Sequence, residues 1–202
     1  MIFGYPKVNV PSLIVIVGIL HLIESILILI DGTRDTIPVY IEHQRFTPAG
    51  AYIMNKMWPI PLVTLLTTGK IAFPIVAVLI YEDEAITQIP LRRAKESSFW
   101  SAFYGLVILI LAIASYGIQW LAYIAAFVTL FLRELLFILN RRGQRIGKPA
   151  FVAPWRGIRV LDALPESIGE RMGIRQGDII LNVNGRQVNS EAMLREILAD
   201  CP

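Results

Sequence analysis

The chain has 202 residues, 55% of them hydrophobic, and a formal net charge of +3. A mean hydropathy of +0.58 is too high for an ordinary soluble protein, so the composition excludes that class and indicates a membrane protein. No basic stretch is interleaved with aromatic residues, so we expect no nucleic-acid partner. The single cysteine, Cys201, can form neither an internal disulfide nor a metal site by itself, which fits a reducing compartment.

Four apolar segments have the length of about 20 residues that crosses the hydrocarbon core of a bilayer. They predict transmembrane helices near residues 12–30, 58–81, 99–115 and 120–139, within a helical domain of residues 1–140 that has the lipid bilayer as its partner. The first segment contains no small-residue cleavage site, so it predicts a retained anchor. Aromatic residues at the segment ends favour the headgroup region: Trp58, Tyr81, Trp100, Tyr116 and Trp120.

The positively charged residues predict how the chain is oriented. With four spans, the N-terminus, the loop before the third span and the C-terminal segment share one side. That side carries Lys7, Arg92, Arg93, Lys95, Arg141, Arg142, Arg145 and Lys148, against Arg34, Arg45 and Lys56 opposite. Because cytoplasmic loops retain Lys and Arg, both termini are predicted in the cytoplasm, at the cell membrane.

The second apolar segment differs from the other three. It contains Pro59, Pro61, Pro74, Gly69 and Lys70, which make it a candidate for a broken or re-entrant helix. Its loss as a span would reverse the predicted sidedness.

Five charged or polar residues fall inside the predicted spans. Because such residues are costly in hydrocarbon, we expect them to pair between helices and fix the bundle, with a proton or ion path as the alternative: His21, Glu24, Lys70, Arg133 and Glu134. A zinc protease needs two histidines one helical turn apart, whereas "HLIES" holds one. We therefore expect no catalytic residue, no metal, no cofactor and no enzymatic activity.

The composition changes after Asn140. Residues 141–148 form a basic linker, and residues 149–202 contain short strands and turns. The runs "GIRVLDAL" and "DIILNV" predict strands, Asn184 and Gly185 predict a tight turn, and "NSEAMLREILAD" predicts a helix capped by Ser190.

The ordered set from "RGIRVLDAL" through "GIRQGDIILNVNG" to "SEAMLREI" resembles a PDZ domain of the bacterial type. The resemblance implies that an extended peptide, often a protein C-terminus, adds to a strand within "GKPAFVAP", beside the helix that contains Ala192 to Ile197. It also implies a carboxylate-accepting loop at Gly147 to Phe151 and an apolar pocket lined by Ile158, Leu194 and Leu198. Arg159 is expected on the solvent face. The implied peptide-binding residues are Gly147, Lys148, Pro149, Ala150, Phe151, Val152, Ile158, Leu194, Ile197 and Leu198.

The expected fold is thus an α-helical transmembrane bundle of about four spans, followed by a small α+β PDZ-like domain (149–202) that is incomplete at its C-terminus. This arrangement resembles the MinJ-like polytopic PDZ proteins of Gram-positive bacteria, which implies a non-enzymatic membrane scaffold that recruits division-site proteins. The alternative is a fragment or inactive relative of a site-2-type intramembrane protease, whose PDZ domain would gate substrates.

Overall fold

The structure is a computed structural model that describes residues 10–42, 48–67, 71–118 and 120–199, without the side chains of residues 63–67 and 71–75. The chain divides into two compact units. The first comprises Met1–Asp35, Met54–Asp83 and Pro90–Arg142, and the second comprises Thr36–Ile53, Glu84–Ile89 and Gly143–Pro202. Each unit is described by itself below.

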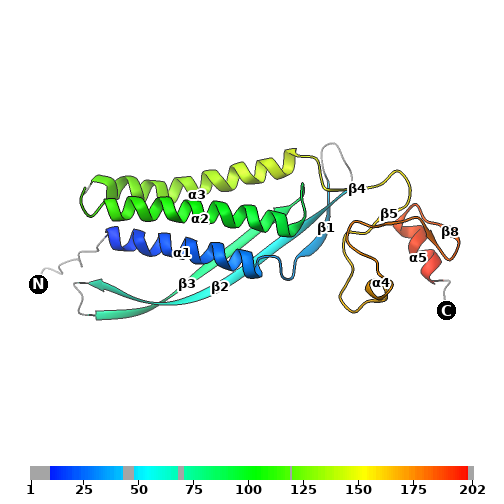
Figure 1. The fold of residues 1–202 in the computed structure, drawn as a ribbon, viewed down its shortest axis with the longest axis horizontal. Coiled ribbons are helices and arrows are strands. Elements are labelled where there is room, and N and C mark those ends of the chain that lie inside the picture. Colours follow the sequence, from blue (N-terminus) through cyan, green and yellow to red (C-terminus); the bar gives the residue numbers. More distant parts are fainter. Residues whose placement is uncertain (1–9, 43–47, 68–70, 119, 200–202) are drawn as a thin grey trace, which may run out of the picture. The chain divides into compact units, whose positions relative to one another are not determined.

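Three long helices form most of the first unit: α1 (Val10–Asp31), α2 (Pro90–Ala114) and α3 (Trp120–Ile146) (Figure 1). In the described part of the chain, these three are long and apolar enough to cross a membrane. They contain the first, third and fourth predicted segments almost entirely. Helix α2 begins at Pro90, because a proline at the first helical position removes no hydrogen bond and already has a helical φ.

Helices α1 and α2 approach each other closely where each has a glycine. A Cβ atom on Gly105 would lie 3.0 Å from Gly18 O and 3.0 Å from His21 Cβ. Small residues at such a crossing let two helix backbones pack directly, as is common between membrane helices. The bundle core continues with Ile14, Tyr104, Ile108, Ala112 and Ala125, all buried.

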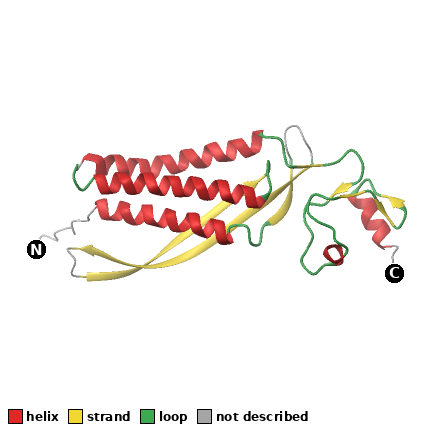
Figure 2. Cartoon of the chain, in the orientation of Figure 1, coloured by secondary structure: helices red, strands yellow, loops and turns green. Residues whose placement is uncertain are grey.

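The second predicted span is not a helix, so that prediction is wrong. Residues 58–67 lie in strand β2 (Ala49–Thr67) and residues 71–81 in strand β3 (Ile71–Ala85), as Figure 2 shows. The predicted count of four helical spans is therefore not confirmed. Prolines exclude a regular helix but are tolerated on unpaired strand edges, and β2 has its β1 partner only as far as Ile53.

Strand β2 is the centre of a four-stranded sheet in which β1 (Ile37–Ile41) and β3 are its neighbours. Strand β1 is antiparallel to β2, with Ile37 opposite Ile53 and Ile41 opposite Ala49. Strand β4 (Phe151–Val152) also pairs antiparallel with β2, which brings the linker after α3 to the base of the hairpin.

The remaining elements of the second unit are short. They are β5 (Ile158–Arg159), α4 (Ile168–Arg171), β6 (Ile179–Ile180), β7 (Asn182–Val183), β8 (Arg186–Gln187) and α5 (Glu191–Ala199). Strand β5 pairs with β6 and β7 pairs with β8. Asn184 and Gly185 both have positive φ, which confirms the predicted tight turn. Ser190 Oγ accepts from Met193 N at 3.2 Å, which confirms the predicted cap of α5.

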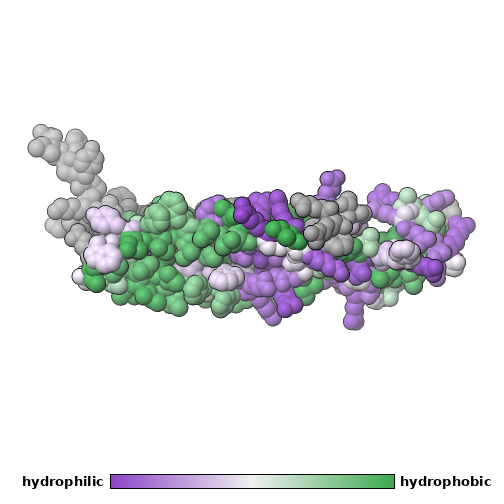
Figure 3. All heavy atoms as spheres, turned by 90° about the horizontal axis from the view of Figure 1, so that it is seen from above, coloured by the Kyte–Doolittle hydropathy of each residue, from purple (hydrophilic) through white to green (hydrophobic). Residues whose placement is uncertain are grey.

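The surface composition follows the two units. Figure 3 shows hydrophobic residues over much of the visible face of the helices, whereas hydrophilic residues gather at one end of the helices and in the C-terminal region. Apolar residues also alternate along one face of the hairpin, where Met57 in β2 and Val76, Val78 and Ile80 in β3 are each at least half exposed. The exposed apolar surface of the first unit is compatible with insertion into a membrane.

Candidate functional site: an intramembrane polar cluster and a peptide-docking region

Glu24 is the centre of a polar cluster inside the helical bundle. His21 and Glu24 lie three residues apart on α1, so they share a face, and His21 Nδ1 is 2.7 Å from Glu24 Oε2. Ser101 Oγ on α2 donates to the same carboxylate at 2.9 Å, and Arg133 Nη2 on α3 is 3.5 Å from its other oxygen. One carboxylate therefore ties three helices together.

Of the other predicted intramembrane residues, Glu134 does not join this cluster. Lys70 lies outside the described residues, and Glu134 is exposed on the surface of α3. Within the described ranges, no group of three or more His, Cys, Asp or Glu side chains is placed to hold a metal ion. His21 has its ring edge against Tyr104, with the ring centroids 4.7 Å apart. The cluster has the contacts that a helix-joining role requires.

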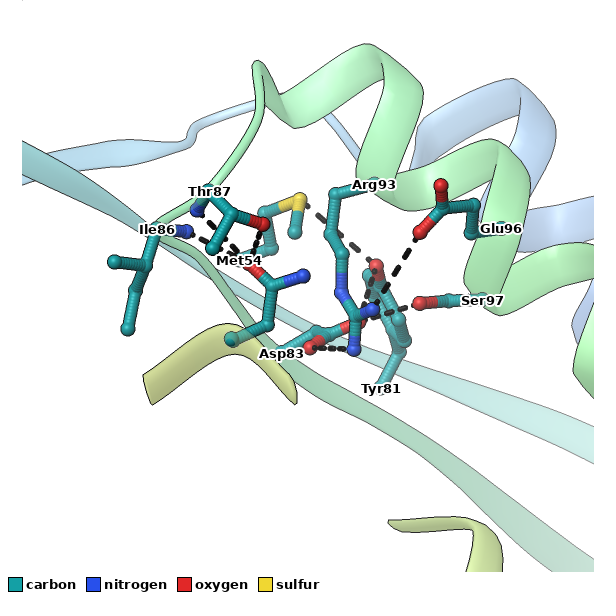
Figure 4. A network of polar contacts seen from close by, with 9 residues as sticks. Met54, Tyr81, Asp83, Ile86, Thr87, Arg93, Glu96 and Ser97 are labelled. Carbon is teal, nitrogen blue, oxygen red and sulfur yellow. Dashed lines mark hydrogen bonds and ion pairs between the residues drawn. The ribbon is translucent and has the colours of Figure 1, made fainter. Parts of the chain in front are cut away.

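A second polar network lies where β3 leads into α2 (Figure 4). Arg93 is buried and holds Asp83 through two hydrogen bonds of 2.9 Å, from Nε to Oδ2 and from Nη2 to Oδ1. Ser97 Oγ also donates to Asp83, and burial together with the Asp83 charge raises the pKa of Tyr81 above its ordinary value. This paired geometry fixes the hairpin beside α2.

The end of α3 is tied to the loop between β3 and α2. Gln144 is buried, and its Oε1 accepts from Ile86 N, Thr87 N and Thr87 Oγ1, each at 3.1 Å. Three donors on one amide oxygen hold the C-terminal end of α3 against this loop.

The segment predicted to accept a peptide carboxylate makes its own internal hydrogen bonds. Gly147 N donates to Gly143 O at 3.2 Å, and Ala150 N donates to Ile86 O at 2.8 Å. Lys148 is exposed, and Pro149 has no N–H group. In this conformation, the N–H groups of Gly147 and Ala150 are not free for a carboxylate.

A strand, β4, lies within the segment that is predicted to receive a peptide, and it pairs with β2. Ala49 is opposite Val152 and Gly50 is opposite Phe151. Arg159 Nε donates to Val152 O at 3.0 Å and the residue is half-buried, so its place on the solvent face stays a prediction.

Helix α5 has the amphipathic pattern predicted for the groove wall. Ile197 is buried at 5% exposure, Leu194 is half-buried, and Leu198 is 54% exposed. Ile158 is half-buried in β5. A pocket that contains Ile158, Leu194 and Leu198 together stays a prediction, because no contact between them is established.

The turns of the C-terminal region are those that its glycines predict. Gly173 ends α4 and Gly177 precedes β6, both with positive φ. Val188 is fully buried, and its N–H donates to Leu181 O at 2.9 Å. Residues 159–201 match the PDZ domain family. This region is a PDZ domain. No curated protein and no solved structure matches the chain.

Several contacts of the PDZ domain involve residues that the sequence did not single out. Tyr52, in β2, donates from its hydroxyl to Leu161 O and accepts from Gln176 Nε2 at 2.6 Å. Burial raises the pKa of the Tyr52 hydroxyl. The only local signal is the run of small residues "AGA" before Tyr52, which lets another strand approach closely.

Proposed function

We propose that this chain is a non-enzymatic membrane adaptor that recruits a protein partner through its PDZ domain. The observation that carries the proposal is the PDZ domain at residues 159–201, on the same chain as three apolar helices of membrane-spanning length. PDZ domains bind extended peptides by strand addition, so the module supplies recognition and the helices supply anchoring. The resemblance to MinJ-like proteins extends the proposal to bacterial division-site partners. This extension rests only on the sequence resemblance.

The cluster around Glu24 favours this function over proteolysis. Both of its carboxylate oxygens are engaged, by His21 and Ser101 on one side and by Arg133 on the other. A carboxylate that acts as a general base must reach a water or a substrate proton, whereas this one faces donors on its own and two neighbouring helices. The contacts support a structural role for it in an adaptor.

A peptide titration of the full-length chain in detergent tests recruitment. A library of C-terminal peptides should contain binders with Kd on the order of 1 μM or weaker. Leu194→Lys should weaken binding at least tenfold, because it puts a charge beside the expected apolar pocket. Glu196→Lys adds the same side chain at an exposed position of α5 and should leave binding within twofold. Equal binding by all three proteins would argue against this groove.

The orientation that we propose follows from three helical spans instead of four. The N-terminus and the PDZ domain then face opposite sides of the membrane. Lys7 is the one basic residue of the N-terminal side, and the short α2–α3 connection adds none. Leaving aside Lys70, which lies outside the described residues, the other side has ten before residue 149: Arg34, Arg45, Lys56, Arg92, Arg93, Lys95, Arg141, Arg142, Arg145 and Lys148. This charge asymmetry favours a cytoplasmic PDZ domain and an external N-terminus.

Reporter fusions test that orientation. A reporter that is active only in the cytoplasm should be active after Lys148 and silent when fused before Met1. The reverse pattern would place the PDZ domain outside. Activity of both fusions would restore the four-span arrangement, in which both termini are cytoplasmic.

A further inference from the structure

Strand β4, the strand expected to receive a partner's peptide, already has a strand along its edge. Ala49 and Gly50 of β2 pair antiparallel with Val152 and Phe151. At this level Gly50 lies between Tyr40 of β1 and Phe151 of β4. The base of the hairpin thus occupies the position that strand addition would give to a bound peptide.

Strand β2 packs closely against Phe151 and Leu161 because Gly50 has no side chain. A Cβ atom there would overlap Leu161 Cδ2 and lie 3.0 Å from Phe151 Cβ. Ala49 and Ala51, on either side, are 0% and 2% exposed. Leu161 therefore packs against bare backbone at Gly50, and any larger residue has to displace it.

Tyr52 supplies the second specific contact. Side chains two residues apart on a strand point to the same face. Tyr52 therefore points to the face on which a Cβ atom at Gly50 would meet Leu161 and Phe151. Its ring packs edge-on against Phe151, with centroids 5.5 Å apart. Its hydroxyl donates to Leu161 O and accepts from Gln176 Nε2 at 2.6 Å. Tyr52 is 1% exposed, and both hydrogen bonds are partly buried.

We propose that Phe151, Leu161 and Gln176 form a recognition surface for an extended strand that carries glycine and, two residues later, tyrosine. Gly50 and Tyr52 are its resident ligand. This inference rests on the proposed strand-addition function and names the partner class: a protein segment with the same Gly-x-Tyr pattern, which competes with β2 for the edge of β4. Capture of such a partner is then coupled to release of the hairpin base.

Disulfide cross-linking in the membrane tests whether the strand is resident. In a Cys201→Ser background, Ala49→Cys with Val152→Cys should cross-link under mild oxidation, because directly opposed strand residues lie within disulfide reach. Ile37→Cys with Val152→Cys is the control. Ile37 is opposite Ile53, four residues or roughly 13 Å along β2 from Ala49, so this pair should not cross-link. Failure of the first pair would overturn the proposal.

Peptide binding to the full-length chain tests the recognition pattern. The probe is Ala-Gly-Ala-Tyr-Ile with both ends blocked and lysines added outside the motif for solubility. It should bind the Gly50→Val protein at least tenfold more tightly than wild type, because valine displaces the resident strand. Tyr52→Phe, which keeps the ring and removes only the hydroxyl, should also bind it more tightly than wild type. Probes with phenylalanine for tyrosine, or valine for glycine, should bind about tenfold more weakly.

Equal binding of the three probes, or equal binding of the Tyr-containing probe by wild type and both variants, would overturn the inference. The blocked probes have no free carboxylate, so their result is separate from that of the C-terminal peptide library. Library binding without discrimination among the blocked probes would leave the recruitment function in place and remove the resident-ligand proposal. Probe binding in the expected order without any library binder would support the resident-ligand proposal and limit strand addition to internal segments, without C-terminal peptides.

Discussion

Glu24→Ala should destabilise the helical bundle by about 3 kcal/mol, a large fraction of the stability of a small membrane domain. The change leaves His21 Nδ1 without its partner, leaves Ser101 Oγ with only its longer contact to His21 O, and leaves Arg133 without its counter-charge. Individual hydrogen bonds between membrane helices contribute only about 0.6 to 1.7 kcal/mol, so the size of the effect comes from losing three contacts together.

Glu24→Gln separates the lost acceptor from the lost charge. Glutamine keeps an oxygen that can accept from Ser101, so we expect a loss of about 1 kcal/mol and normal peptide binding. The measurement is the midpoint of unfolding in mixed detergent, followed for both variants and for wild type. If alanine were as well tolerated as glutamine, the cluster would not hold the helices together.

Gly105→Leu should separate α1 from α2 at their closest approach and destabilise the bundle by about 3 kcal/mol, at the upper end of the usual cost of overpacking. A Cβ atom at this position meets Gly18 O at 3.0 Å, His21 Cβ at 3.0 Å and Leu22 N at 3.3 Å. Two of these are backbone atoms, which cannot move aside as a flexible side-chain end can. The whole crossing has to widen, and this also stretches the hydrogen bond from Ser101 on α2 to Glu24 on α1.

Gly143→Leu is the matched control for Gly105→Leu. Gly143 is also helical, in α3, and a Cβ atom there meets nothing within 4 Å. Leucine should therefore be neutral or slightly stabilising, because it has a higher helix propensity than glycine. The thermal unfolding midpoints of both variants in detergent give the comparison. Similar losses in both would attribute the effect to leucine in a membrane helix and not to the crossing.

The three long helices could be predicted from the sequence because their signal is simple. Each has an uninterrupted apolar run, and length with composition decides such segments. The boundaries were less accurate. Helix α2 begins at Pro90, nine residues before the predicted span, because its polar first turns pack against the hairpin through Arg93. Hydropathy registers only the apolar part of such a helix.

The segment around Trp58 was misassigned because hydropathy measures apolar content and not backbone geometry. Pro59 and Pro61 are compatible with a strand whose outer edge is unpaired, and Met57 is exposed between Lys56 and Trp58, which are half-buried. Period-two alternation of this kind marks a strand. The alternation is present in the sequence, but the apolar content of the segment favoured a helix.

The PDZ region was predictable because its turns are coded locally. Glycines at 173, 177 and 185 have the positive φ that the motif requires, and Ser190 caps α5. The contacts of Tyr52 with Leu161 and Gln176 could not be predicted, since the partners are 109 and 124 residues apart in the chain. No local pattern in "AGAYIM" indicates which distant surface it meets.

Flotation of reconstituted vesicles tests most directly whether this chain recruits a protein to a membrane. The cargo is a soluble fluorescent protein that ends in the best-binding library peptide. It should float with vesicles that contain the wild-type chain or Glu196→Lys and should stay at the bottom of the gradient with Leu194→Lys or empty vesicles. Cargo that floats equally with Leu194→Lys and wild type, or with neither, would contradict recruitment through the PDZ groove.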